Sequence, residues 1–557
     1  MKRGKNRCGT VISPERCADG AYIYSGKCVK TKAKIGFADE KKTSKAANDD
    51  KISTEVCITE KNKSNDKTDA IMTRGGEMLK EETKGYKKSL AAIQQELKDA
   101  KIPVIVLVEG FATSGKGTLI NELISEMDPR FVSVKILDHM LKERDRYPFL
   151  YPYYNTIPEN GKIYFLDSGW MEEAVRDAVH EKTDKKEFGK RIEEIRGFER
   201  QLRDNGYVVI KYFLTTDKKT QEKRQRKLRE DGNTDWRVSK QDLYQNDRFD
   251  TFAKKYEEFM AATNDVNPWV VINTDDKKEV FYTAFKHMYE VLTAQLEAGK
   301  YNGEPYEAEF DFPEETPKLE DADLRAFLDD SFYKDELKKL QSRLGKLHSM
   351  IYRRRIPVVL CFEGWDAAGK GGNIKRIAYP LDPRGFDIYP IASPSPEEKN
   401  RHHLWRFWNK VPRTGHVAIF DRTWYGRVMV ERIEGFCTEN DWKRAYAEIN
   451  EFEKNLTDWG AVVLKFWIHI DSDTQLERFT LRQNTPEKQW KITDEDWRNR
   501  DKWPQYEEAI GEMIAKTSTN NAPWYIIESK DKKYARIKTL RIICESLEKA
   551  IDEFDRK

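Results

Sequence analysis

One unit of sequence occurs twice in this chain of 557 residues, at a nearly constant spacing. In each occurrence a short apolar segment leads into a glycine-rich loop, and Lys370 minus Lys116, the lysines of the two loops, is 254. The same spacing relates Asp128 to Asp382, Asp167 to Asp421, Gly206 to Gly460 and Trp236 to Trp490. The chain is therefore an internal duplication of a unit of roughly 225 residues, and we expect both copies to have one fold.

Apolar segments alternate with helical patterns in each copy, which predicts α/β domains with a parallel sheet covered by helices. Val104–Val108 and Val358–Phe362 have the composition of equivalent buried strands. The predicted organisation is two tandem P-loop kinase-like domains, each with a helical lid. Its predicted ranges are a disordered extension (1–75), the first copy (76–300), a proline-containing linker (301–324) and the second copy (325–557).

The loop of the second copy matches the phosphate-loop pattern G-x-x-x-x-G-K at Gly364, Gly369 and Lys370. Glycines are needed there because several backbone N–H groups must approach the phosphate oxygens closely. The residues assigned to phosphate binding are Gly364, Ala367, Ala368, Gly369, Lys370, Gly371 and Gly372. Gly371 replaces the usual Ser or Thr, so the nearby Asp366 is the predicted Mg²⁺ ligand in the loop. The alternative is a glycine-rich turn with a surface lysine.

The strand Val417–Phe420 ends in Asp421, which is predicted to be a second Mg²⁺ ligand. Arg422 and Arg427 follow, and both are candidates for neutralising a transferring phosphoryl group. The first copy keeps an aspartate and a lysine at the equivalents of 421 and 370. It has Ala112, Ser168 and Glu173 at the equivalents of Asp366, Arg422 and Arg427. We therefore expect the first copy to be inactive, with a structural or regulatory role.

Two further segments of the second copy carry candidate binding residues. The basic residues assigned to a polyanion track are Lys399, Arg401, Arg406, Lys410 and Arg413. A solvated basic surface explains these five equally well. Later, Thr493 has the sequence context of a helix N-cap, with Asp496 at the third helical position. This helix belongs to a predicted lid, in which Lys491 is the catalytic candidate.

Composition narrows the class of protein. Lys and Arg number 99 and Asp and Glu 96, so net charge indicates no nucleic-acid partner. No run of about 18 apolar residues and no signal-peptide core occurs, which favours a cytoplasmic protein without a membrane span. Cys361, Cys437 and Cys544 are expected to be reduced and packed. Cys8, Cys17 and Cys28 do not have zinc-ribbon spacing.

Several motifs, taken together, resemble one family. They are Gly364–Gly372, Phe420–Arg427, Glu434–Thr438, Lys465–Trp467, Gln489–Ile492 and Ala522–Trp524. In this order they resemble the signatures of family-2 polyphosphate kinases, over the whole second copy and more weakly over the first. Thr423 stands where the family commonly has Ser.

The resemblance implies Mg²⁺-dependent transfer of a phosphoryl group between inorganic polyphosphate and a nucleotide. Two-copy members are similar to polyphosphate:AMP phosphotransferases, which form ADP and whose second copy is active, whereas single-copy members tend to act on ADP or GDP. The predicted function is therefore phosphorylation of AMP by polyphosphate. An ATP-dependent nucleoside monophosphate kinase and a nucleotide-gated polyphosphate-binding protein with little turnover are the alternatives.

Overall fold

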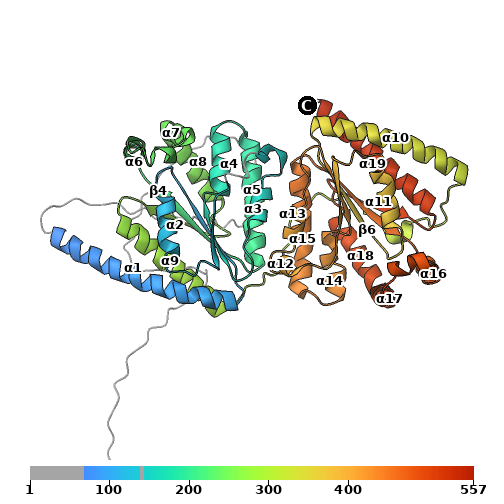
Figure 1. Cartoon of the computed structure of the whole chain (residues 1–557), viewed down its shortest axis with the longest axis horizontal. Helices are drawn as coiled ribbons and strands as arrows, with labels where there is room; N and C mark the ends of the chain where they lie inside the picture. Colours follow the sequence, from blue (N-terminus) through green and yellow to red (C-terminus); the bar gives the residue numbers. More distant parts are fainter. Residues whose placement is uncertain (1–67, 138–142, 557) are drawn as a thin grey trace, which may run out of the picture. The chain divides into compact units, whose positions relative to one another are not determined.

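Two five-stranded sheets, one in each copy, organise the protein in the computed structural model, which describes residues 68–137 and 143–556 (Figure 1). Every strand pair is parallel, and the strand orders are β2-β3-β1-β4-β5 and β7-β8-β6-β9-β10. Counted from the first strand of each copy, these orders are identical. The predicted fold class, two tandem parallel-sheet domains covered by helices, is confirmed.

The elements of the first copy are α1 (Thr68–Asp99), β1 (Val104–Gly110), α2 (Lys116–Ile124), β2 (Val132–Lys135), α3 (Tyr151–Asn155), β3 (Ile163–Asp167), α4 (Trp170–Val179), α5 (Lys185–Asp204), β4 (Val208–Thr215), α6 (Lys218–Glu230), η2 (Asp235–Arg237), α7 (Lys240–Asp247), α8 (Phe249–Ala262), β5 (Trp269–Asn273) and α9 (Lys277–Ala298). The connection to the second copy contains the short helix η3 (Leu319–Asp321).

The elements of the second copy are α10 (Asp330–Arg354), β6 (Val358–Gly364), α11 (Lys370–Ala378), β7 (Phe386–Pro390), α12 (Pro396–Lys399), α13 (Trp405–Trp408), β8 (Val417–Asp421), η4 (Trp424–Arg427), α14 (Val430–Ile433), α15 (Glu439–Asp458), β9 (Val462–His469), α16 (Ser472–Gln483), η5 (Pro486–Lys491), α17 (Asp494–Asp501), α18 (Trp503–Thr517), β10 (Trp524–Glu528) and α19 (Lys532–Arg556).

Helix α1 begins earlier than the amphipathic segment that the sequence indicated. Residues 68–75, which the sequence placed in the irregular extension, are helical. The apolar positions at helical spacing that face the sheet, Leu90, Ile93 and Leu97, all lie in the later half of the helix. A helix whose first turns carry no such pattern gives no periodic signal in its sequence. Cys8, Cys17, Cys28 and residues 1–67 of the predicted extension lie outside the described residues.

Each sheet is buried on both faces, as a parallel sheet requires. In the first copy, α1, α2 and α9 pack on one face and α4, α5 and α8 on the other (Figure 1). The central strand β1 (Val104–Gly110) is buried along its whole length. Its counterpart β6 (Val358–Gly364) is buried up to Glu363. The loop that follows each central strand is therefore anchored to the most rigid part of its copy.

A buried lysine–glutamate pair occurs at the same place in both copies. Lys465 Nζ lies 2.7 Å from Glu453 Oε2 and donates to the Thr517 carbonyl, and both charged side chains are fully buried. Lys211 and Glu199 form the same contact at 2.8 Å in the first copy. Desolvation is expensive for such a pair, so each charge depends on its partner. The buried lysine–glutamate pair is thus retained in the first copy, which lacks the equivalents of Asp366, Arg422 and Arg427.

The two copies contact each other reciprocally. Asn160 donates its backbone N–H to the Asn400 carbonyl at 2.8 Å, and Thr414 donates to the Arg146 carbonyl at 3.0 Å. These four residues are two pairs of equivalents at the spacing of 254. The equivalent rings of Tyr154 and Trp408 stack on each other with centroids 4.6 Å apart. Contacts of this reciprocal kind characterise two-fold symmetric dimers, so the chain resembles a dimer joined into one polypeptide.

The described part of the chain can be compared with two expectations, one on membrane-spanning helices and one on cysteines. Among these residues, no helix is both long and apolar enough to cross a membrane. Cys361 and Cys544 are buried free thiols and Cys437 is a half-buried one, which confirms the expectation of packed, reduced cysteines.

Candidate active site in the second copy

The loop between β6 and α11 has the backbone conformation of an anion cradle. Gly364, Ala367 and Gly369 have φ values of +148°, +62° and +120°, and a left-handed residue between right-handed ones turns successive N–H groups to one side. A Cβ on Gly364 would lie 2.4 Å from the Ile468 carbonyl oxygen, so only glycine fits there. The loop leads directly into the N-terminus of α11 at Lys370, whose dipole favours negative charge.

Lys370 lies over this loop. Its Nζ donates to the carbonyl oxygens of Gly364 at 2.6 Å and Trp365 at 3.3 Å. The ammonium is therefore held at the mouth of the cradle by two neutral acceptors. The ammonium also lowers the pKa of the buried Glu363, and as a cation it attracts an arriving phosphate.

The cradle opens into a cavity of about 640 Å³. The predicted site residues that line this cavity are Gly364, Asp366, Lys370, Lys399, Arg401, Arg406, Arg422 and Arg427. Its wall also includes apolar side chains, among them Trp365, which stacks on Trp503 with ring centroids 3.6 Å apart. A cavity with a basic lining, an apolar wall and a phosphate-type loop fits a phosphorylated ligand that also carries a ring.

The two predicted metal ligands lie on adjacent structural elements at the same edge of the sheet. Asp421 ends β8 beside Phe362 of β6, and Asp366 lies in the loop that extends β6. Asp366 accepts hydrogen bonds from Asn499 at 3.1 Å and Arg422 at 3.5 Å. Carboxylate oxygens are the kind of ligand that Mg²⁺ takes, together with waters that it retains.

A third carboxyl group, Glu363, lies beneath these residues and was not a predicted site residue. It is buried, and it accepts hydrogen bonds from the backbone N–H and the hydroxyl of Thr423, both at 2.7 Å. Burial raises the pKa of Glu363. Glu363 therefore fixes the segment that carries Arg422. Its signal in the sequence is a carboxylate at the end of an otherwise apolar strand, present in both copies as Glu363 and Glu109.

The two predicted arginines differ in their surroundings. Arg422 is half exposed and has a left-handed backbone with φ of +65°. Burial alone would lower the pKa of Arg422, but Asp366 and Glu363 raise it overall. Arg427 is more enclosed and donates to Glu431 at 2.7 Å. Both guanidinium groups reach the cavity as cations with carboxylate partners that a polyanion could replace.

The five residues of the predicted track separate into two groups. Lys399, Arg401 and Arg406 line the cavity. Lys410 and Arg413 lie outside this lining: Lys410 donates to the Arg406 carbonyl, and Arg413 lies 3.9 Å from Glu143 of the first copy. The sequence could not separate these groups because it does not show that α13 ends at Trp408, before Lys410 and Arg413.

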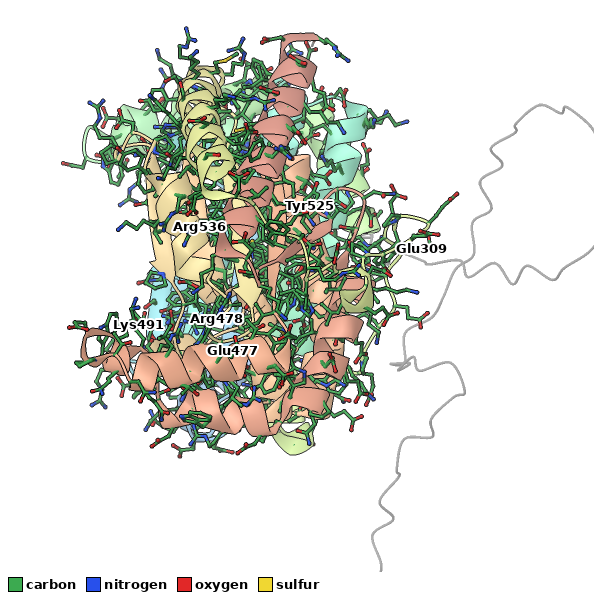
Figure 2. All side chains as sticks on the ribbon, turned by 90° about the vertical axis from the view of Figure 1, so that its right-hand side faces the viewer. Glu309, Glu477, Arg478, Lys491, Tyr525 and Arg536 are labelled. Atoms are coloured by element: carbon green, nitrogen blue, oxygen red, sulfur yellow. The ribbon has the colours of Figure 1, made fainter. Side chains whose placement is uncertain are left out.

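The predicted lid is helical, and its N-cap is confirmed, since Thr493 and Asp496 form a capping box. Lys491 is exposed, lies 5.0 Å from the centroid of the Trp490 ring and is not in the cavity lining (Figure 2). Asn499 reaches Asp366 instead, so the lid contacts the loop through a residue that the sequence did not single out. Its i,i+4 neighbour Glu495 also lines the cavity.

Helix α16 (Ser472–Gln483) supports the loop from behind. Gln475 donates to the Asp366 carbonyl at 3.1 Å, and Arg478 donates to the carbonyls of Ala367 at 3.0 Å and Ala368 at 2.9 Å (Figure 2). These side chains satisfy the loop carbonyls. Of the seven residues assigned to phosphate binding, Gly364 and Lys370 line the cavity, and Ala368 and Gly372 donate their N–H groups to loop carbonyls.

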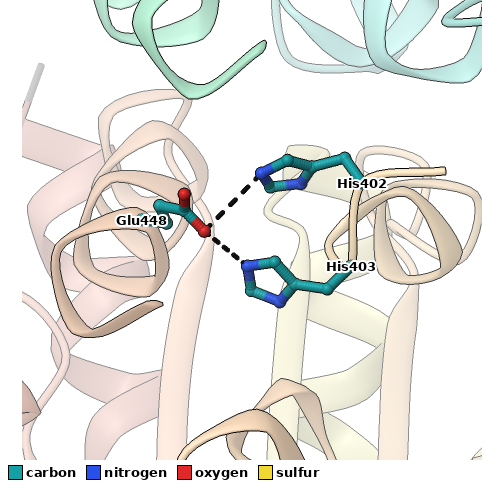
Figure 3. A group of neighbouring side chains, drawn as sticks. All are labelled: His402, His403 and Glu448. Atoms are coloured by element: carbon teal, nitrogen blue, oxygen red, sulfur yellow. Dashed lines mark hydrogen bonds and ion pairs between the residues drawn. The ribbon is translucent and has the colours of Figure 1, made fainter. Parts of the chain in front are cut away.

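Two neighbouring histidines, the buried His402 and the half-buried His403, lie against Glu448 (Figure 3). The Nε2 atoms of His402 and His403 lie 3.6 Å and 2.6 Å from Glu448 Oε2. The group has the composition of a metal site. However, the Leu404 N–H donates to His402 Nδ1, so Nε2 of that ring carries its proton and points it at Glu448. We interpret the group as hydrogen-bonded imidazoles that position His403, which lines the cavity.

His403 makes stability depend on pH. Burial lowers its pKa to about 3, although the hydrogen bond to Glu448 acts in the opposite direction. The ordinary pKa of histidine is 6.5, so below this pH the unfolded chain binds a proton that the folded chain does not. The free energy of unfolding therefore decreases as the pH is lowered. Between pH 6.5 and pH 5 we expect a loss of about 2 kcal/mol from this residue. Between pH 6.5 and pH 5, the melting temperature of His403→Gln measured by calorimetry should fall less than that of the wild type. An equal fall in both proteins would contradict the pH dependence assigned to His403.

The loop of the first copy has the same backbone conformation but different side-chain contacts. Gly110, Thr113 and Gly115 keep the positive φ values of the second copy's loop. Ala112, the equivalent of Asp366, donates its backbone N–H to Gln245 Oε1 at 2.7 Å. Gln245 is the equivalent of Asn499, so here the lid bonds to the loop backbone itself and uses one of the cradle's N–H groups.

One anion-neutralising position of the first copy has changed sign and another is neutral, since Glu173 and Ser168 replace Arg427 and Arg422. Glu173, the equivalent of Arg427, is buried and pairs with Arg144 and Tyr153. Burial raises the pKa of Glu109, the equivalent of Glu363, to about 8. An acid where the second copy has an arginine disfavours a phosphoryl group there.

The fold and the site together define a phosphotransferase-type domain present in two copies, of which one retains the full set of charged residues. The family model described as polyphosphate kinase 2 matches residues 76–300 and 327–555. The chain therefore belongs to the polyphosphate kinase 2 family.

Relatives are similar over almost their whole length. A protein of Pseudomonas syringae pv. tomato named polyphosphate:AMP phosphotransferase is 38% identical over 488 residues, which covers 85% of this chain and 97% of the relative. One of the same name from Acinetobacter johnsonii is 39% identical over 467 residues, covering 80% and 90%. A crystal structure from Pseudomonas aeruginosa, assigned to polyphosphate kinase 2, is 36% identical with a TM-score of 0.74 and covers 86% of this chain and 97% of its own.

Proposed function

We infer that the protein is a phosphotransferase that transfers the terminal phosphoryl group of inorganic polyphosphate to AMP and forms ADP. Near full-length similarity to relatives with that name supports the substrates. The observation that carries the assignment to the second copy is that Asp366, Lys370, Arg422 and Arg427 line one cavity, whereas two of the first copy's equivalents are alanine and glutamate.

In the proposed reaction, a phosphate oxygen of AMP forms a bond to the terminal phosphorus of polyphosphate, and the bond from that phosphorus to its bridging oxygen breaks. The shortened polyphosphate leaves. The attacking oxygen is already ionised, so no general base is required. Catalysis then depends on positioning and on neutralising negative charge.

The residues divide this work. The loop N–H groups that are not bonded within the loop, as those of Ala368 and Gly372 are, hold phosphate oxygens together with the Lys370 ammonium. Arg422 and Arg427 neutralise charge on the transferring group. Lys399, Arg401 and Arg406 guide the polyanion toward it. Lys491 would join the site only if the lid closes further, because it lies outside the present lining.

Asp366 and Asp421 are the proposed Mg²⁺ ligands. The ion supplies positive charge that neutralises phosphate oxygens. The protein's part is to hold the two carboxylates at neighbouring strand ends. We further propose that the protein acts in the cytoplasm, where AMP is available and where free thiols such as Cys361 and Cys437 stay reduced.

The test is an assay with the purified protein, AMP, Mg²⁺ and long-chain polyphosphate in the absence of ATP. We expect ADP to accumulate in proportion to enzyme, with polyphosphate shortened by one unit for each ADP. A parallel reaction with ATP in place of polyphosphate tests the alternative that the protein is an ATP-dependent nucleoside monophosphate kinase. ADP formed only with ATP would overturn the proposal, and stoichiometric binding of polyphosphate without turnover would favour the binding protein.

A further inference from the structure

Helix α6 (Lys218–Glu230) of the first copy differs sharply in charge from its equivalent α16 (Ser472–Gln483). Helix α6 has seven basic and two acidic residues, whereas α16 has two of each. Its basic residues are Lys218, Lys219, Lys223, Arg224, Arg226, Lys227 and Arg229. At the equivalent positions the second copy has Ser472, Asp473, Glu477, Arg478, Thr480, Leu481 and Gln483. Only the arginine at 224 and 478 is shared, so the other six charges are particular to the first copy.

The shared residues fix the helix and leave the others at the surface. Gln221 is buried and donates to the Ala112 carbonyl at 3.2 Å. Arg224 donates to Thr274 at 2.7 Å and contacts the loop, as Arg478 does in the second copy. The remaining six basic residues are exposed. The helix therefore presents a fixed basic surface beside the first copy's loop.

The cations of this basic surface outnumber the two acids of α6, Glu222 and Glu230. Among the described residues, none of the six exposed cations forms an ion pair. Lys219, Lys223 and Lys227 follow one another at i,i+4 spacing, where like charges destabilise a helix. Arg237 of η2, which packs against α6, adds a further cation. An arrangement that costs stability and has no internal partner points to an external anion.

We propose that α6 binds a stretch of polyphosphate that lies outside the catalytic cavity of the second copy. The proposal rests on the proposed function, because the donor is then a linear polyanion much longer than the part that reacts. A row of lysines at successive helical turns suits a flexible chain with one charge per unit. The first copy would thereby contribute donor binding without catalysis. A single-stranded nucleic acid offers a similar charge pattern and is examined as an alternative outcome.

The test replaces residues of α6 by those at the equivalent positions of α16. The variant Lys219→Asp, Lys223→Glu, Lys227→Leu gives α6 the side chains of α16 at exposed positions. We expect KM for long-chain polyphosphate to rise about tenfold and the slope of log affinity against log salt to shrink by about 2, since three cations are lost. With a donor of a few phosphate units, kcat and KM should be unchanged.

A matched control removes the same charge elsewhere. Lys334→Asp, Lys338→Glu, Lys339→Leu changes three exposed lysines of α10 by the same net amount and should leave KM for both donors unchanged. If the α6 variant keeps the wild-type KM for long chains, or if the α10 variant loses affinity equally, the proposal is wrong. Tighter binding of α6 to a single-stranded oligonucleotide than to polyphosphate would also overturn it. A failure of AMP phosphorylation with any donor would instead refute the proposed function.

Discussion

Lys370→Ala is expected to lower kcat by a factor on the order of 10²–10³, because it removes the one ammonium that the loop holds at the phosphate position. In the structure this ammonium donates only to two loop carbonyls. Its loss removes a charge that lowers the pKa of the buried Glu363, but Glu363 keeps its hydrogen bonds to Thr423, so the fold should be retained. Initial rates of ADP formation from AMP and polyphosphate, at saturating concentrations of both, measure the effect.

Lys116→Ala is the internal control for this prediction. Lys116 makes the equivalent contacts to Gly110 and Phe111 in the first copy, at 3.2 Å and 3.3 Å. Any general effect of truncating a loop lysine on folding should therefore appear equally in both variants, and kcat should fall only in Lys370→Ala. If Lys116→Ala abolished activity in a folded protein, the assignment of catalysis to the second copy would be wrong.

The duplication explains how the sequence could indicate so much of the site. Two copies of one fold allow each position to be compared with its equivalent, and the loss of Asp366, Arg422 and Arg427 in the first copy separates chemical residues from structural ones. Lys465 and Lys211, by contrast, look alike in the sequence and are both buried in the structure with a glutamate. Retention alone does not identify the core, however, because Lys370 and Asp421 are retained as well, as Lys116 and Asp167.

The residues that the sequence did not reveal act through tertiary contacts. Asn499 reaches Asp366 across 133 positions of the chain, and Glu448 meets His403 across 45. Helical periodicity predicts the face of a helix on which such a residue lies, but it does not predict which distant residue that face contacts. The end of α13 at Trp408 is likewise not visible in the sequence, and it separates Arg406, which lines the cavity, from Lys410, which does not. Between α12 and α13 the chain contacts the first copy, where Arg401 pairs with Glu159.

Asp421→Asn is expected to lower kcat by a factor on the order of 10² or more and to raise the Mg²⁺ concentration needed for half-maximal activity. Asparagine preserves the size of the side chain, and the Asp421 carbonyl still accepts from Ile391, so β8 keeps its place at the sheet. Only the negative charge is removed. Calorimetric titration of Mg²⁺ into the protein with AMP bound measures the loss of affinity independently of turnover.

Asp167→Asn supplies the control, because Asp167 ends β3 as Asp421 ends β8 and the first copy has Ala112 where a second carboxylate would be needed. One carboxylate without a second holds Mg²⁺ weakly, so this change should leave both kcat and the Mg²⁺ requirement as in the wild type. Asp366→Asn should behave like Asp421→Asn, since both carboxylates are proposed to contact the same ion. An Asp421→Asn protein with a normal Mg²⁺ requirement would show that the ion is held elsewhere, and the charge at the end of β8 would then act directly on the orientation of Arg422.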